Sequence, residues 1–132
     1  RCMANAIKTI KTPVTYINTH GTSTPAGDIT ELDAIREVFD RTEQDMPHIS
    51  STKSMTGHSL GATGVQEAIY SLLMMKHDFV APSINIETLD PGAGNMPIAR
   101  KLIEGVKHQT VMSNSFGFGG TNCTLAMSRY EG

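Results

Sequence analysis

Three polar, glycine-bearing loops of the sequence hold the residue types that could do chemistry. The first contains His20, the second contains Lys53 and His58, and the third is the glycine turn 117–120. Each loop directly follows a segment that we predict to be a strand. Ligands of α/β sheets collect beyond the carboxyl ends of the strands. We therefore expect the three loops to converge on one crevice.

The histidines in these loops suggest hydrogen-bonding chemistry at a carbonyl group. A neutral imidazole can donate a hydrogen bond to a substrate carbonyl, and a buried lysine beside His58 would help to keep that imidazole neutral. A structural role is the competing interpretation for each histidine taken alone. We expect His48, His77 and His108 on the surface or in loops. Neither H-E-x-x-H nor Cys/His ligand spacing occurs in the sequence, which argues against catalytic zinc.

The nucleophile elbow of α/β-hydrolases, G-x-S-x-G, is matched by Gly57-His58-Ser59-Leu60-Gly61. An elbow requires an apolar strand that ends at the first glycine, whereas a polar stretch precedes Gly57. A triad would also need a later acid and histidine, for which only Asp90 and His108 could be nominated. Serine hydrolysis through Ser59 is thus one alternative function, and a helix N-cap is the simpler interpretation of Ser59.

The third loop resembles a phosphate-binding loop in composition. A strand is expected after it and not a helix, so the dinucleotide-binding fingerprint fails on context. A tight glycine turn can expose backbone N–H groups as an oxyanion hole. A plain hairpin turn is the alternative.

Alternating strands and helices must position these loops. Apolar spacing and capping patterns predict helices over residues 1–11, from Asp28 to about Phe39 with Glu31 completing a capping box, and from 59 or 60 to about 76. The last of these is apolar nearly all round, so we expect it to be buried on several sides. Strands are predicted at 14–18, 48–51, 110–114 and 123–128. The fold class is therefore α/β, a mixed sheet with helices packed on it that ends in a β-hairpin.

Composition excludes several classes of protein. The chain has 132 residues, a formal net charge of −2 and an apolar fraction of 39%. These values disfavour disorder, collagen-like repeats and coiled coils, and give no reason to expect nucleic acid or a membrane as partner. Charged residues make up 18%, below the roughly 25% that is typical, which indicates that some surface meets other protein. Two cysteines without a C-x-x-C pair, and no signal-peptide pattern, favour a reducing, cytoplasmic location.

The text of the three loops resembles the C-terminal half of bacterial β-ketoacyl-[acyl-carrier-protein] synthases. The matching runs are HGTSTP at 20–25, KSMTGH at 53–58 and NSFGFGGTN at 114–122, and they occur in the family's order. Residues 64–73 resemble the synthase I type of fatty-acid elongation. The resemblance covers nearly the whole chain.

The resemblance implies a thiolase-like fold, in which two similar α/β halves stack into five layers. It also implies a decarboxylating condensation, in which malonyl-carrier protein loses carbon dioxide and the resulting enolate attacks an acyl thioester on a cysteine. The implied partners are acyl- and malonyl-loaded acyl carrier protein and a second subunit in a homodimer. No cofactor is required.

Individual residues take their expected roles from the same resemblance. His20 and His58 match the two active-site histidines, and Lys53 matches the lysine that supports them, with Glu31 as its carboxylate partner. Phe118 matches the gating phenylalanine, whose backbone N–H helps to form the oxyanion hole. The pantetheine-binding threonines are matched by Thr22 and Thr24, and a structural monovalent-cation site of some relatives by Asn18, Glu67, Ser113 and Asn114.

The sequence departs from the family at the nucleophile. The family's cysteine lies in the N-terminal half, within a Cys-Ser-containing turn, and neither Cys2 nor Cys123 has that context. The strand that opens the family's C-terminal half is also missing. We therefore expect residues 1–132 to be the C-terminal thiolase-like domain without its first strand and without the N-terminal half, and to be inactive alone. A non-catalytic interaction module is the other alternative.

Overall fold

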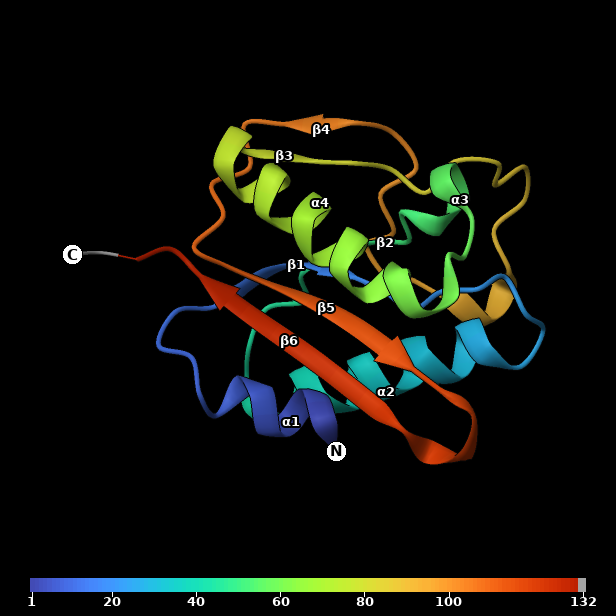
Figure 1. Cartoon of the computed structure of the whole chain (residues 1–132), viewed down its shortest axis with the longest axis horizontal. Coiled ribbons are helices and arrows are strands. Elements are labelled where there is room, and N and C mark those ends of the chain that lie inside the picture. Colours follow the sequence, from blue (N-terminus) through green and yellow to red (C-terminus); the bar gives the residue numbers. More distant parts are fainter. Residues whose placement is uncertain (131–132) are drawn as a thin grey trace.

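A four-stranded sheet with the order β2-β1-β5-β6 lies at the centre of the molecule (Figure 1). The computed structural model describes residues 1–130, so the last two residues of the expected domain lie outside it. The strands are β1 (Val14–Asn18), β2 (His48–Ser50), β5 (Thr110–Phe116) and β6 (Asn122–Ser128). β1 runs parallel to β2 and β5, and β6 returns antiparallel to β5. The predicted mixed sheet and closing hairpin are confirmed.

Helices cover both faces of this sheet. They are α1 (Cys2–Ile7), α2 (Gly27–Thr42), α3 (Lys53–Thr56) and α4 (Thr63–His77), with 3-10 turns η1 (Leu60–Ala62), η2 (Pro91–Ala93) and η3 (Phe118–Gly120). A separate antiparallel pair joins β3 (Phe79–Val80) to β4 (Ile103–Glu104). Figure 1 shows α1 and α2 below the sheet and α4 above it.

The strands divide the core between these two layers. Because successive residues of a strand point to opposite faces, Ile17 and Met112 pack with α1 and α2, whereas Tyr16 and Val111 pack with α4. All four side chains are completely buried. The alternation on β1 and β5 therefore fixes the three-layer arrangement.

The two edges of the sheet differ. The outer edge of β2 is covered, since Ile49 N–H donates to Pro97 O (3.1 Å) and Ile49 O accepts from Ala99 N–H (2.8 Å). Within residues 1–130, β6 pairs only with β5, so its outer edge is open.

The opening helix and the start of α2 differ from the prediction. α1 ends at Ile7 and does not extend to residue 11, and Thr9 Oγ1 donates to Ala6 O (2.7 Å), a local bond that competes with helix continuation. The capping box is wrong as well. Ala26 occupies the N-cap position of α2 without a side-chain bond, because Asp28 accepts from Ser23 N–H (3.1 Å) in the preceding loop.

His108 was expected at the surface or in a loop, but it is completely buried. Its Nε2–H donates to Phe79 O (2.9 Å), because a carbonyl oxygen can only accept, and Nδ1 then accepts from Thr15 Oγ1 (2.8 Å). Burial is the main cause that lowers the pKa of His108. A loop position in sequence therefore hid a core histidine with both ring nitrogens bonded.

The outer side of α4 is more exposed than predicted. Val65, Ile69, Leu72 and Leu73 lie on it, with exposed fractions from 44% to 66%. Within the described part of the chain, α4 contacts β5, β3 and η1, which leaves this apolar side uncovered (Figure 1).

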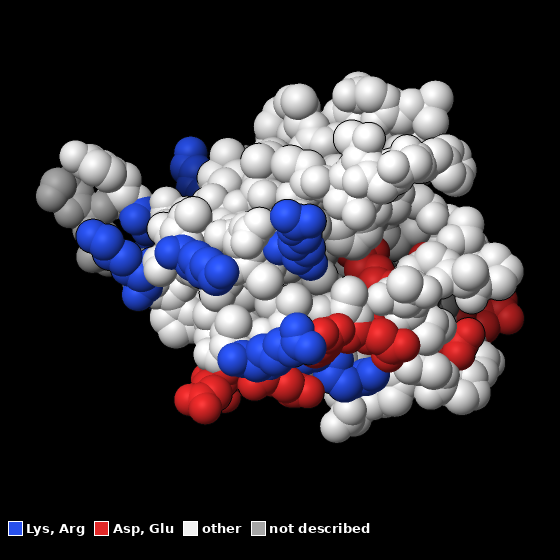
Figure 2. All heavy atoms as spheres, turned by 90° about the horizontal axis from the view of Figure 1, so that it is seen from below, with Lys and Arg blue, Asp and Glu red and all other residues white. Residues whose placement is uncertain are grey.

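Charge is mixed on the face that carries α1 and α2. Figure 2 shows basic and acidic side chains next to one another there, and two ion pairs lie along α2, Arg36–Asp33 (2.6 Å) and Arg41–Glu37 (2.7 Å). Of the helices that the structure describes, none has the length and apolar content to cross a membrane.

We expect an isoleucine-to-alanine substitution to cost much more stability in the core than on the outer side of α4. Ile35 of α2 is completely buried, so Ile35→Ala should lower the free energy of unfolding by about 2–5 kcal/mol. Ile69→Ala on the outer side of α4 is the matched control and should cost less than about 1 kcal/mol. Urea unfolding followed by circular dichroism measures both. Equal losses would contradict this assignment of the core.

Candidate active site

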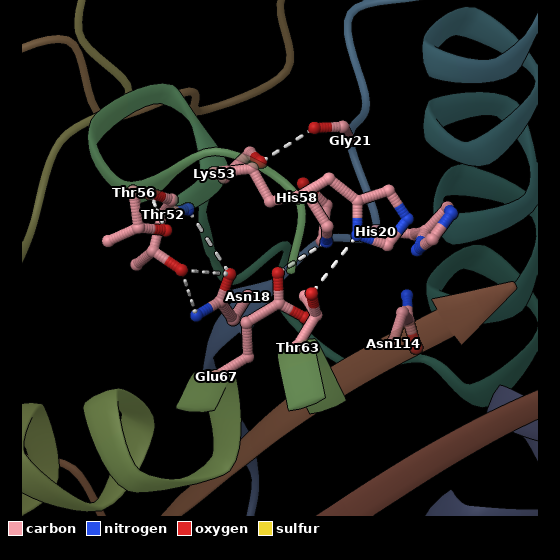
Figure 3. A network of polar contacts seen from close by, with 12 residues as sticks. Asn18, His20, Gly21, Thr52, Lys53, Thr56, His58, Thr63, Glu67 and Asn114 are labelled. Atoms are coloured by element: carbon pink, nitrogen blue, oxygen red, sulfur yellow. Dashed lines mark hydrogen bonds and ion pairs between the residues drawn. The ribbon is translucent and has the colours of Figure 1, made fainter. Parts of the chain in front are cut away.

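The first two loops meet beyond the carboxyl ends of the parallel strands. The rings of His20 and His58 pack edge to face, with centroids 5.4 Å apart and an interplanar angle of 88°. Phe116, the last residue of β5, lies 6.0 Å from the His20 ring. Figure 3 shows the polar network that links these loops to α4 and β5. The predicted convergence is confirmed for these two loops.

The third loop contributes less than expected. The Phe118 side chain is fully exposed to solvent, so it makes no contact with either histidine. The glycine turn is closed by a bond from Gly117 N–H to Thr121 O (2.8 Å). In this structure the Phe118 side chain therefore lies outside the histidine cluster, and its expected gating role and backbone N–H stay predictions.

The position of the proton on His58 follows from its neighbours. Leu60 N–H donates to His58 Nδ1 (3.2 Å), and Thr63 Oγ1 lies 3.0 Å from the same nitrogen. A backbone N–H can only donate, so Nδ1 is the acceptor and the neutral ring has its proton on Nε2. Leu60 adopts a left-handed backbone (φ 53°), a conformation that costs on the order of 1 kcal/mol outside glycine. This strain aims the Leu60 N–H at the imidazole.

Glu31 holds the His20 loop in place. Its carboxylate is buried and accepts from His20 N–H (3.0 Å), Gly21 N–H (2.9 Å) and the side-chain amide of Asn114 (3.0 Å). Burial raises the pKa of Glu31, and these three donors oppose the rise. The predicted pairing of Glu31 with Lys53 is wrong, because the carboxylate is used by the loop backbone and by Asn114.

Lys53 instead forms a buried ion pair with Glu67 of α4. Burial raises the pKa of Glu67, and the bond from Lys53 opposes the rise. The sequence contains a signal for this pair. Thr63, Glu67 and Ser71 recur along one side of α4 and are all buried there, and a charged side chain on an inward-facing side requires a partner of opposite charge.

His20 itself lies in an environment that disfavours its charged form. Burial lowers its pKa, and the positive charge of Lys53 and the neighbouring His58 lower it further. Its Nδ1 is buried and has no hydrogen-bond partner within the described residues. His20 is therefore neutral near pH 7, and within the described residues its ring nitrogens make no hydrogen bond to the protein.

The loop that follows β1 also requires a glycine. Gly21 has φ +28°, and a Cβ at this position would lie 2.6 Å from Thr19 Oγ1 and 2.8 Å from the Ser51 Cβ. Ser51 Oγ donates to Gly21 O (2.7 Å), which joins the His20 loop to the segment before α3.

The hydroxyls of the two threonines after Gly21 lie close together, but only one of these residues lines a cavity. Thr22 Oγ1 and Thr24 Oγ1 are 3.5 Å apart, and Thr24 Oγ1 also accepts from Gly27 N–H (3.2 Å). Thr24 lines a cavity of about 740 Å³ between this loop and residues 83–98, whereas Thr22 does not line it.

The hydrolase interpretation is wrong. The helix α3, and not a strand, directly precedes Gly57, so the strand–turn–helix context of a nucleophile elbow is not formed. Ser59 does occupy the N-cap position of the short η1 turn, as the simpler interpretation had it, but its side chain makes no cap bond.

Two of the side-chain oxygens proposed for a monovalent cation already accept hydrogen bonds. Asn18 Oδ1 accepts from Thr52 N–H (3.3 Å), and Asn114 Oδ1 accepts from Thr124 Oγ1 (2.8 Å). Of the Asn18, Asn114 and Glu67 side chains, only Glu67 keeps a buried oxygen, Oε2, without a partner. Residues 1–130 also hold no group of three or more His, Cys, Asp or Glu side chains that could ligate a metal ion.

Comparison with known proteins identifies the family to which this chain belongs. Residues 1–87 match the family model described as Beta-ketoacyl synthase, C-terminal domain. The chain therefore belongs to the β-ketoacyl synthase C-terminal domain family, and its fold is thiolase-like as predicted.

Its similarity extends to particular proteins. The chain is 61% identical to 3-oxoacyl-[acyl-carrier-protein] synthase 1 of Haemophilus influenzae over 100% of this chain and 32% of that protein. The Escherichia coli K12 protein of the same name is 60% identical over 99% of this chain and 31% of the relative. The chain thus spans about a third of the length of these relatives.

Solved structures give the same result. A β-ketoacyl synthase from Burkholderia phymatum superimposes with a TM-score of 0.81 at 38% identity, covering 97% of this chain and 29% of that one. A ketosynthase solved in a type II polyketide complex with its acyl-carrier protein gives 0.85 at 32% identity, covering 98% and 33%.

The environment of His20 predicts how stability depends on pH. Because its pKa is lowered from the ordinary 6.5, the unfolded chain binds this proton more readily than the folded protein does. Acidification below pH 6.5 therefore favours unfolding until the folded protein also binds this proton, with a slope of at most about 1.4 kcal/mol per pH unit from this group. In His20→Gln this part of the slope should vanish, whereas the exposed control His77→Gln should keep it. Urea titrations across this pH range would contradict the assignment if both variants behaved alike.

Proposed function

We propose that this chain forms the C-terminal part of a β-ketoacyl-[acyl-carrier-protein] synthase, with His20, His58 and Lys53 serving the decarboxylation of a malonyl thioester. The observation that supports this most directly is the pair of histidine rings 5.4 Å apart, one with its proton assigned to Nε2 and the other with a lowered pKa. Two neutral imidazoles at this separation can donate to one developing oxyanion.

The chemistry follows from these positions. Loss of carbon dioxide from a malonyl thioester leaves its electron pair as an enolate, whose negative charge gathers on the thioester oxygen. N–H donors aimed at that oxygen stabilise the charge of the enolate more than they stabilise the ground-state carbonyl, so they lower the barrier. The enolate carbon then attacks an acyl thioester, and the thiolate leaves. The cysteine that carries this acyl group would come from a part of the enzyme outside this chain.

Lys53 acts through charge. Its ammonium, held by Glu67, is one of the causes that lower the pKa of His20. A neutral His20 can donate only one N–H and cannot protonate the enolate as readily as an imidazolium would, so the carbanion survives to attack the thioester.

The remaining expectations belong to the same proposal. Acyl carrier protein would be the partner that delivers both thioesters, since one similar ketosynthase was solved with its acyl-carrier protein. Thr22 and Thr24 would bind the pantetheine arm beside the cavity that Thr24 lines. The exposed apolar side of α4 would pack against the other half of the synthase, and the enzyme would be a cytoplasmic homodimer. A structural monovalent cation held by Asn18, Glu67, Ser113 and Asn114 would belong to the same proposal, in which the unpartnered Oε2 of Glu67 is one available ligand.

A complementation experiment tests whether the chain works as this part of a synthase. We expect the isolated chain to show no condensation of malonyl-carrier protein with an acyl thioester, because neither of its cysteines has the context of the nucleophile. A chimera in which this chain replaces the matching third of the H. influenzae synthase 1 should restore turnover. Condensation by the isolated chain, or an inactive but folded chimera, would contradict the proposal.

Substitution of the histidines tests their roles in that chimera. His20→Ala and His58→Ala should each slow decarboxylation of malonyl-carrier protein by at least about 100-fold, while acyl transfer to the cysteine changes much less. The exposed His77→Ala is the control and should leave both rates unchanged. The assignment is wrong if acyl transfer collapses and decarboxylation is spared.

A further inference from the structure

Thr63 stands at the first position of α4 with its hydroxyl turned toward His58. Its side chain is buried, and Oγ1 lies 3.0 Å from His58 Nδ1 across the η1 turn. A hydroxyl at a helix start commonly satisfies a free backbone N–H of that helix. Here the hydroxyl bonds the imidazole instead, and Ala62 takes the N-cap position without a side-chain bond.

The direction of this hydrogen bond is fixed by Leu60. The Leu60 N–H enters the same Nδ1 lone pair at 3.2 Å, so Nδ1 carries no proton and the Thr63 hydroxyl must donate. The ring is thus held by two donors, one from the backbone and one from a side chain. Rotating the ring by 180° would place C–H groups against both donors and leave the buried Thr63 hydroxyl unpaired, which is costly.

We propose that Thr63 is a positioning residue, whose hydroxyl acts with the Leu60 N–H to hold the orientation and the Nε2–H tautomer of His58. Its role in the reaction rests on the proposed function, since the Nε2–H of His58 is the group that would donate to the enolate oxygen. The hydrogen bond itself does not depend on that function. Thr63 acts differently from Lys53, because it supplies a directed O–H and no charge.

The tautomer can be measured on the isolated chain without any activity. In ¹⁵N-labelled protein at pH 9, we expect the His58 Nδ1 resonance in the unprotonated, pyridine-like range, displaced by the hydrogen bonds that it accepts. In Thr63→Val, which keeps the shape but lacks the hydroxyl, this resonance should move toward the value of a free acceptor nitrogen, and in Thr63→Ser it should return. His58→Gln assigns the resonance, and Thr30→Val, a threonine in the first turns of α2, is the matched control.

In the chimera, the same variants give a kinetic readout. Thr63→Val should lower kcat for malonyl decarboxylation about fivefold, the effect of losing one neutral hydrogen bond, with KM little changed. Thr63→Ser should recover most of that rate.

Two results would overturn the role of Thr63. One is a protonated Nδ1 in the unaltered chain, and the other is an Nδ1 resonance that is the same in Thr63→Val as in the unaltered chain. An unaltered kcat in a folded Thr63→Val chimera would likewise remove it from the reaction. A chimera without any decarboxylation would instead refute the proposed function, while the resonance would still decide the positioning role.

Discussion

The carboxylate of Glu31 connects three parts of the molecule at one buried point. It extends from α2, accepts from two consecutive backbone N–H groups after β1, and accepts from Asn114 on β5. A buried carboxylate is stable only when such donors replace water, so helix, loop and strand must keep this geometry together. The position of His20, and with it the separation of the two histidine rings, depends on this arrangement.

A second buried carboxylate organises the other side of the site. Glu67 holds Lys53 from α4, while the start of the same helix presents Thr63 to His58. The helix α4 therefore positions both the Lys53 ammonium and the His58 imidazole of the second loop. Each of the two histidine loops is held by its own buried carboxylate, and the two carboxylates come from helices on opposite faces of the sheet.

The sequence predicted the strands and the convergence of the loops better than it predicted which side chains bond one another. β1 was predicted with its observed bounds, because Val14-Thr15-Tyr16-Ile17-Asn18 is β-branched and aromatic and follows a proline. The pairing of His20 with His58 was also predicted, because parallel strands bring their carboxyl ends to the same edge. The partner of Lys53 was not, because Glu31 was taken from the resemblance and the burial of Glu67 on the inner side of α4 was not considered.

Other errors have a similar origin in tertiary contacts. Asp28 and Glu31 have the spacing of a capping box, yet both side chains bond the preceding loop, since tertiary partners outcompete the local cap. His108 lies in a loop as expected, but its complete burial was not predicted, because nothing in its own segment shows that Thr15 and Phe79 surround it. The role of Phe118 rests on the resemblance alone and stays a prediction, since its exposed ring does not decide what its backbone N–H does.

The open edge of β6 affects the solubility of the chain. Its seven residues, Asn-Cys-Thr-Leu-Ala-Met-Ser, include no charge and no proline, the features by which natural edge strands resist pairing with other chains. The uncovered apolar side of α4 lies on the same molecule. In concentrated solution such a surface favours strand addition and aggregation over the monomer, so a covering segment here would protect solubility as much as it would complete a catalytic site.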